Sequence, residues 1–206
     1  MEWKLFKNYI PTDIVKYLKD YTLKVRHQVQ GVLNEEKTIG SGTYWKGVDM
    51  ASSLPIASDE ENKKLFDIYT SLNMYELVAN YIDFPYLFND QIVVKLPGED
   101  FDFKPHYDNQ FGPYPDDKEL VTKNFMLVLD DFTKENGGIK ILDGEWIDLY
   151  PKEGDILMID GNTVHSSGNN KSHGPRRAYL CVYSNKPIGK NFQKGFYYQP
   201  FIDYVQ

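Results

Sequence analysis

The pattern of the chain changes after Phe84-Pro85, and this change most constrains the fold. From there on, short runs of β-branched and aromatic residues alternate with Gly, Pro, Asp and Asn, which is typical of short strands joined by tight turns. A helical start followed by about eight such strands predicts a mainly β protein with some α. We expect a double-stranded β-helix, a cupin-like jelly roll, flanked by N-terminal helices. The expected strands are 91–96, 101–106, 124–130, 139–142, 146–150, 155–159, 163–166 and 177–184.

Two segments of the N-terminal part have helical periodicity. Apolar residues recur at helical spacing in 11–24, which predicts a short amphipathic helix. In 58–82, Ser58 and Glu61 have the spacing of a capping box and precede a long apolar stripe. We expect 58–82 to be the longest helix and to cover one face of the sheet. The segment 25–42 has no clear pattern.

Length and composition indicate one domain. A chain of 206 residues matches the size of one domain with a substantial core. We therefore expect a single domain over 1–206, with 1–85 as a largely helical support region and 86–206 as the β-helix core with a metal site. The 16 Tyr and 12 Phe favour an aromatic-rich β core.

The net charge and the cysteine content restrict the expected binding partners and cellular compartment. The net charge of −7 argues against nucleic acid as a partner, because phosphate backbones require clustered Lys and Arg. The single cysteine, Cys181, cannot form an internal disulfide, and the N-terminus lacks the apolar run of a signal peptide. We expect a cytoplasmic protein without membrane contact. The aromatic segment 192–205 is expected to pack on the domain, with a homodimer contact as the alternative.

His106, Asp108 and His165 are the candidate metal ligands. Residues two apart on a strand point to the same side, so His106 and Asp108 can reach one ion while Tyr107 points away. Two imidazoles and one carboxylate can bind one face of an octahedral ferrous ion and leave the opposite face open for an organic acid and dioxygen. His173 is the competing histidine, but it lies in a Gly-, Asn- and Ser-rich turn and is expected to be exposed.

Arg176 follows His165 by eleven residues, at the start of the next expected strand. A hairpin through Gly168 to Gly174 would place the metal ligand and the guanidinium side by side. Arg177 must face the other way on an alternating strand, so one arginine is expected to be buried and the other solvated or bound elsewhere. A buried arginine requires an anion, and a dicarboxylate cosubstrate would supply one.

These motifs together resemble the Fe(II)/2-oxoglutarate-dependent dioxygenase superfamily. The resemblance is carried by His106-x-Asp108, the Asp130 to Gly138 segment, Gly154-Asp155, His165 to Asn169, and Arg176. Within the superfamily the chain is most similar to the phytanoyl-CoA dioxygenase-like branch, over about residues 90 to 185. The resemblance implies that His106, Asp108 and His165 bind iron and that Arg176 binds the distal carboxylate of 2-oxoglutarate. It also implies that Ser167 assists Arg176 and that Asn124 lies near the metal-bound end of the cosubstrate. For both residues a structural role, as turn serine and strand-end asparagine, stays open.

The chain departs from that branch in one respect. Only fifteen residues separate Gly138 from Gly154, and this compact core is more similar to prolyl-hydroxylase-type members. A fatty acyl-CoA substrate is therefore disfavoured. The resemblance implies an enzyme that uses Fe(II), 2-oxoglutarate and dioxygen to hydroxylate a C–H bond of a small molecule, releasing succinate and carbon dioxide. Two alternatives stay open: a protein or peptide hydroxylase of the same chemistry, and a jelly-roll binding module or a cupin with another metal. The polar loop 109–123 is a candidate substrate cover.

Overall fold

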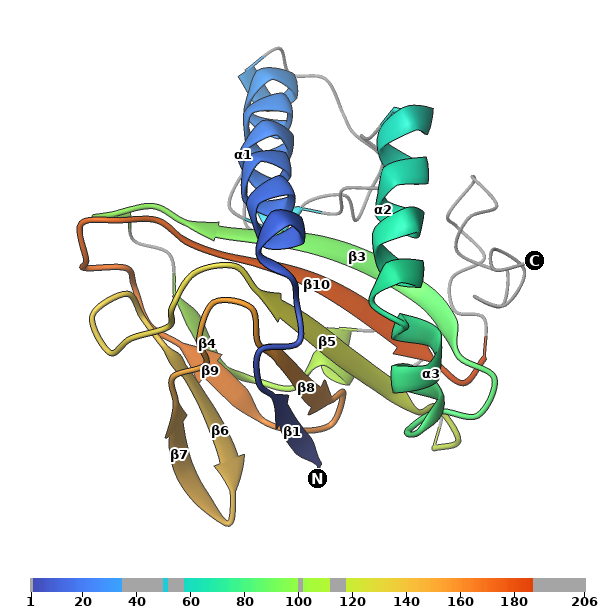
Figure 1. Ribbon diagram of the computed structural model, residues 1–206. Coiled ribbons are helices and arrows are strands. Elements are labelled where there is room, and N and C mark those ends of the chain that lie inside the picture. Colours follow the sequence, from blue (N-terminus) through green and yellow to red (C-terminus); the bar gives the residue numbers. More distant parts are fainter. Residues whose placement is uncertain (1, 35–49, 52–57, 100–101, 112–117, 187–206) are drawn as a thin grey trace.

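Eight antiparallel strands form two facing sheets in the manner of a double-stranded β-helix (Figure 1). The computed structural model describes residues 2–34, 50–51, 58–99, 102–111 and 118–186. One sheet has the order β8-β5-β10-β3 at its centre, and the other has the order β4-β9-β6-β7. This confirms the predicted jelly-roll class. The core strands are β3 (Tyr86–Lys95), β4 (Phe103–His106), β5 (Thr122–Val128), β6 (Ile139–Asp143), β7 (Glu145–Leu149), β8 (Ile156–Asp160), β9 (His165–Ser167) and β10 (Arg176–Ser184).

Two short strands extend the larger sheet to six. β1 (Trp3–Phe6) pairs with β8, and β2 (Met50–Ala51) pairs with β3. The sequence pattern did not indicate β1. Its pairing partner lies about 150 residues away, at Ile156 to Ile159, so no local periodicity signals the pairing.

Three helices lie on the outer face of the larger sheet (Figure 1). They are α1 (Thr12–Asn34), α2 (Asp59–Ser71) and α3 (Met74–Ala79). The capping box at Ser58 and Glu61 is confirmed at the start of α2. The prediction of one long helix over 58–82 is wrong: it divides at Asn73, which has a left-handed φ of 49°. α1, with 23 residues, is longer than either part and runs well past the predicted end at residue 24.

Alternate side chains of the larger sheet enter two different cores. On β10, Tyr179 and Cys181 pack under the helices, whereas Ala178 and Leu180 face the space between the two sheets. This alternation follows from the two-residue period of a strand. The strands β5, β8 and β10 are accordingly buried on both faces along most of their length.

Some predictions fall outside the described residues. The aromatic segment 192–205 and most of the loop 109–123 are among them, so the homodimer contact and the substrate cover stay predictions. The division into one domain and the cytoplasmic location also stay predictions. Within the described part of the chain, no helix is both long enough and apolar enough to cross a membrane.

Candidate metal centre

The structure brings His106, Asp108 and His165 together. His106 ends β4, His165 opens β9, and the two residues are direct partners across these antiparallel strands. Asp108 begins a short 3-10 helix, η1 (Asp108–Phe111), immediately after β4. Asp108 Oδ1 lies 3.8 Å from His106 Nε2 and 3.7 Å from His165 Nε2. One potential ligand atom from each residue lies within 4.8 Å of the other two, a spacing that fits a single ion between them.

Backbone carbonyls orient both imidazoles. His106 Nδ1 lies 2.6 Å from the Lys104 carbonyl oxygen, and His165 Nδ1 lies 3.0 Å from the Thr163 carbonyl oxygen. A carbonyl oxygen can only accept, so each Nδ1 carries the hydrogen and donates it. In the neutral imidazole the lone pair is then on Nε2, the nitrogen that faces Asp108. Such outer hydrogen bonds commonly fix the tautomer of metal-binding histidines, so the donor set suits a divalent transition metal.

Asp108 is held by the segments around it. The Asn109 backbone N–H donates to the Gly161 carbonyl at 2.9 Å, and Thr122 Oγ1 donates to Asn109 Oδ1 at 2.5 Å. Asn124 Nδ2 donates to Asp108 Oδ2 at 3.4 Å. Asn124 is buried, and its Oδ1 has no hydrogen-bond partner among the described residues. Asn124 therefore lies beside the metal ligands with one acceptor unused.

Arg176 is the buried member of the arginine pair. It is 3% exposed, donates from Nη1 to the Gly138 carbonyl at 2.7 Å, and stacks 4.3 Å from the centre of the Phe132 ring. Its Nε has no hydrogen-bond partner in the described part of the chain. Burial lowers the pKa of Arg176 to about 9, and the charge of Asp130 opposes that shift. The guanidinium is thus poorly compensated, which is the state expected of an anion-binding group.

Arg177 points to the opposite face of β10 and binds the carboxylate of Asp130. Its Nε and Nη2 donate to the two oxygens of Asp130 at 2.8 Å each, and its backbone N–H donates to Asp130 Oδ2 at 2.8 Å. This two-pronged contact uses the geometry in which arginine binds carboxylates best. The expected division between a buried arginine and one bound elsewhere is confirmed.

Ser167 lies in the same space and contacts a residue that the sequence interpretation missed. Lys95 is fully buried at the end of β3, and its Nζ donates to Ser167 Oγ at 2.8 Å and to the Gly168 carbonyl at 2.6 Å. The Phe103 ring lies 5.2 Å from Lys95 Nζ and 5.7 Å from the His106 ring. Phe103 therefore forms part of the wall between the two ends of the site. In sequence, Lys95 ends an apolar strand like any surface lysine, and only the strand register reveals its position.

A close approach of two glycine backbones forms the turn behind Arg176. Gly168 N–H donates to the Gly137 carbonyl at 2.7 Å. A Cβ on Gly137 would lie 2.1 Å from the Gly168 oxygen, and Gly137 has a φ of 91°. Both conditions require glycine at this position. The Asn136-Gly137-Gly138 turn thus carries the carbonyl that accepts from Arg176, and it fixes the backbone of Gly168, whose carbonyl accepts from Lys95.

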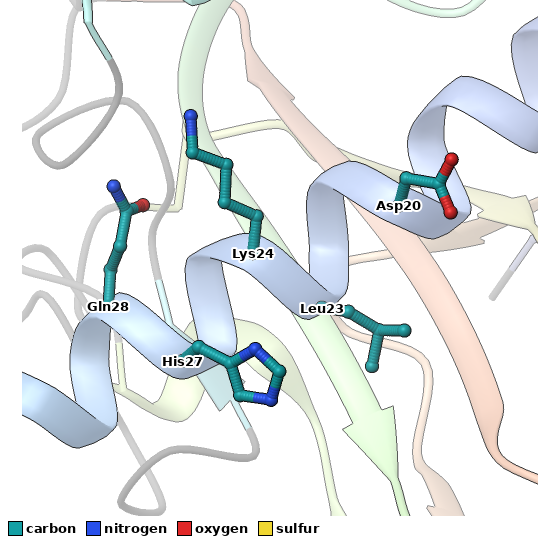
Figure 2. Close-up of a pocket in the computed structure, with 5 residues that line it drawn as sticks. All are labelled: Asp20, Leu23, Lys24, His27 and Gln28. Carbon is teal, nitrogen blue, oxygen red and sulfur yellow. The ribbon is translucent and has the colours of Figure 1, made fainter.

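The other two histidines lie outside this centre. His173 is exposed, as predicted, and His27 is exposed on α1. His27 lines a shallow hollow together with Asp20, Leu23, Lys24 and Gln28, all from the same helix (Figure 2). A hollow formed by side chains of one helix, without convergent groups from a second element, does not resemble a ligand site. The centre between the two sheets is therefore the candidate site.

Comparison with known proteins agrees with this geometry. Residues 140–178 match the family profile of phytanoyl-CoA dioxygenase (PhyH). The dioxygenase andF of Emericella variicolor is 32% identical over 83 residues, which are 34% of this chain and 29% of andF. The match thus spans less than a third of that relative.

Solved structures share the fold at low sequence identity. The epimerase SnoN from nogalamycin biosynthesis, described as non-haem and alpha-ketoglutarate dependent, superposes with a TM-score of 0.62 at 18% identity, over 96% of this chain and 87% of SnoN. AviO1 from Streptomyces viridochromogenes Tue57 superposes with a TM-score of 0.66 at 18% identity, over 91% of each chain. In its partial sequence matches, its fold and its cluster of two histidines and one carboxylate, the chain is similar to phytanoyl-CoA dioxygenase and to other Fe(II)/2-oxoglutarate-dependent enzymes.

Proposed function

We propose that this protein is a non-haem Fe(II)- and 2-oxoglutarate-dependent dioxygenase that hydroxylates a C–H bond of a small molecule and releases succinate and carbon dioxide. The observation that carries the proposal is the joint placement, in one β-helix, of the His106, Asp108 and His165 cluster and the buried guanidinium of Arg176. A structural metal site would account for the first group alone. The two together suit a metal and a dicarboxylate.

The residues present fit both groups. His106 Nε2, His165 Nε2 and Asp108 Oδ1 would hold Fe(II), since each faces the other two. Arg176 and Ser167 would hold the distal carboxylate of 2-oxoglutarate, and Asn124 would lie at its metal-bound end. Bound iron and 2-oxoglutarate supply the activation of dioxygen for oxidation of the substrate. The chain supplies orientation and, through the apolar residues between the sheets, exclusion of water.

A titration with two ligands tests the proposal. Mn(II), which replaces Fe(II) without turnover, should raise the melting temperature, and 2-oxoglutarate should raise it further through binding to the native state. Asp108→Ala should abolish the effect of the metal. Arg176→Ala should abolish the further effect of 2-oxoglutarate while that of the metal persists. No response of the wild type to either ligand, or loss of both responses in Arg176→Ala, would contradict the proposal.

Substrate class and reaction outcome need a separate experiment. SnoN is an epimerase, so the shared fold accommodates outcomes other than hydroxylation. Succinate release should be stimulated by members of a panel of small metabolites, and mass spectrometry of the stimulating compound should show the gain of one oxygen atom. Stimulation by peptides alone would favour the protein hydroxylase alternative. A product without added oxygen would replace hydroxylation with another oxidation.

A further inference from the structure

Gln91 is a buried polar residue on the inner face of β3. Its direct partner across the pairing with β10 is Leu180, and Leu180 and Val93 both belong to the apolar cluster between the two sheets. Residues two apart on a strand point to the same side, so the Gln91 side chain lies on that inner face as well. A carboxamide is thus placed among apolar residues of the interior.

The carboxamide of Gln91 makes no hydrogen bond with any described residue. Gln91 is 8% exposed, so most of its side chain is removed from water. Burial of a carboxamide without hydrogen bonds is unfavourable, because the group loses its bonds to water and gains none in return. The unpartnered atoms that the described residues enclose completely do not include those of Gln91, so its amide keeps some accessible surface. A ligand between the two sheets can therefore reach it.

Gln91 lies at roughly the level of the metal ligands. The Phe103 ring at the start of β4 lies 5.2 Å from Lys95 Nζ at the end of β3, and β4 then runs back below β3 in the view of Figure 1. His106 lies about 10 Å further along β4 than Phe103. Gln91 lies about 13 Å back along β3 from Lys95. The two strands therefore bring His106 and Gln91 to facing positions on opposite sheets.

Gln91 and Asn124 lie on opposite sides of β10. Asn124, on β5, donates to Asp108 Oδ2 at 3.4 Å and is expected at the metal-bound end of the cosubstrate. β3 and β5 both pair with β10, so they are about 9.6 Å apart, twice the spacing of neighbouring strands. A cosubstrate held by Asn124 and Arg176 would leave Gln91 to a second molecule.

We infer that Gln91 is a substrate-binding residue whose carboxamide binds a hydroxyl or carbonyl group of an uncharged, largely apolar small molecule. A carboxamide is neutral and can both donate and accept a hydrogen bond, so it suits such groups. Val93, Leu180 and the Phe103 ring supply apolar surface in the same interior. The inference rests on the proposed function, since it assumes that the substrate binds beside the metal and the cosubstrate, and it adds the substrate class.

The test compares three probes of nearly equal shape on the protein loaded with Mn(II) and 2-oxoglutarate. Benzyl alcohol ends in a hydroxyl, ethylbenzene in a methyl group and benzylammonium in a charge. Mn(II) accelerates the NMR relaxation of probe protons that lie close to it, so the measurement reports binding beside the metal, with Zn(II)-loaded protein as the diamagnetic reference. The wild type should bind benzyl alcohol about fivefold or more tightly than either other probe. No such preference would overturn the inference.

Gln91→Leu should remove the preference. Its affinity for benzyl alcohol should fall about fivefold, to that for ethylbenzene, because the hydroxyl then has no partner. Its affinity for 2-oxoglutarate, measured by calorimetry, should change by less than about twofold. An equal fall for 2-oxoglutarate would make Gln91 a cosubstrate contact, and an unchanged preference for benzyl alcohol would leave it no role in binding. Either result would overturn the inference.

Gln28→Leu is the matched control. Gln28 lies on α1, in the helical layer outside the larger sheet. The same change in shape and polarity there should leave the affinities for all three probes and for 2-oxoglutarate unchanged. If Gln28→Leu also removed the preference for benzyl alcohol, the effect at Gln91 would not be local, and the inference would fail.

Gln91→Met, which keeps the length of the side chain, serves as a second variant should Gln91→Leu fail to fold. Without ligands it should melt at the wild-type temperature or above, since no hydrogen bond to a described residue is lost. A clearly lower melting temperature would mark the carboxamide as structural and overturn the inference. Absence of Mn(II) and 2-oxoglutarate binding to the wild type would contradict the proposed function and this inference with it. Normal binding of both, with the preference for benzyl alcohol retained in both Gln91 variants, would contradict this inference alone.

Discussion

In the ligand-free protein, few groups compensate the buried positive charge of Arg176. Its burial lowers the pKa to about 9, and its described contacts are a carbonyl and an aromatic ring. The desolvation of a single buried ion costs several kcal/mol, and an apolar side chain of similar volume does not bear that cost. We therefore expect Arg176→Met, free of metal and cosubstrate, to unfold in urea at the same concentration as the wild type or a higher one. It should nevertheless lose the stabilisation by 2-oxoglutarate.

Destabilisation of the ligand-free protein by Arg176→Met would instead indicate a structural role for Arg176. A loss of more than about 3 kcal/mol in the ligand-free variant would mark Arg176 as structural, since such a loss exceeds that of the charge-assisted hydrogen bond to Gly138 alone. Arg177→Met provides the contrast. Because Arg177 is the member of the pair bound to Asp130, its removal should destabilise the ligand-free protein and leave cosubstrate binding intact.

The same pKa shift predicts a pH dependence. A folded-state pKa below the ordinary value means that the unfolded chain binds the proton of Arg176 more tightly than the native protein does. The energetic cost of the charge is therefore fully present below about pH 9 and decreases as pH rises through that value. The difference in unfolding free energy between Arg176→Met and the wild type should narrow from pH 8 to pH 10. A difference that widened over this range would contradict the assignment.

Single residues also differ in how much the sequence indicates. His106 and Asp108 are two positions apart, and Arg176 opens the strand after His165, so their spacing in the sequence was enough to group them, although Asp108 begins η1 and does not extend β4. Lys95 was missed because its neighbourhood depends on which strands pair and in which register. Neither the pairing partner of a strand nor its register can be inferred from the residues next to Lys95 in the sequence. Residues whose placement follows from a neighbour in sequence were predictable, and a residue whose placement follows from a neighbouring strand was not.

Among the elements, the Asn136-Gly137-Gly138 turn is the one whose geometry the site depends on most closely. Gly137→Ala would place a Cβ 2.1 Å from the Gly168 carbonyl oxygen, in a backbone region that disfavours side chains. Gly144→Ala is the matched control, because Gly144 also has a positive φ, 74°, but no atom within 4 Å of the added Cβ. Both substitutions place an alanine in the left-handed conformation, which lowers the free energy of unfolding by about 1 kcal/mol. Only Gly137→Ala should also move the Gly168 backbone.

Thermal unfolding and cosubstrate titration together separate these two costs. Gly137→Ala should lower the melting temperature more than Gly144→Ala and should weaken 2-oxoglutarate binding several-fold. Gly144→Ala should bind with wild-type affinity. Equal effects of the two substitutions on binding would show that the approach of Gly137 to Gly168 does not support the pocket.

Element boundaries show where periodicity misleads. The apolar stripe of 58–82 continues across the break at Asn73, because Leu72, Met74 and Leu77 are all buried under α2 and α3. A periodic pattern reports which residues face the core, and it does not report that the backbone changes direction between them. The capping box at Ser58, in contrast, uses only residues three apart and was predictable.

At the scale of the whole molecule, the candidate site joins the two sheets. The metal ligands His106 and His165 belong to the four-stranded sheet, whereas Lys95, Asn124 and Arg176 belong to the six-stranded sheet. The helices contribute to neither group, since they pack on the outer face of the larger sheet (Figure 1). A metal and a dicarboxylate bound between these groups would connect the sheets through the interior. Their binding should therefore stabilise the β-helix more than the helical layer.

Hydrogen exchange measured by mass spectrometry can test this arrangement. With Mn(II) and 2-oxoglutarate bound, amides of β4, β9 and the start of β10 should exchange more slowly than in the ligand-free protein, because local opening there would require release of the ligands. Amides of α1 and α2 should slow only to the extent that global unfolding slows. Mn(II) alone should protect β4 and β9 but not the start of β10, where Arg176 lies. Protection centred on α1, around the hollow lined by His27, would instead place the ligands on the helical face and contradict a site between the sheets (Figure 2).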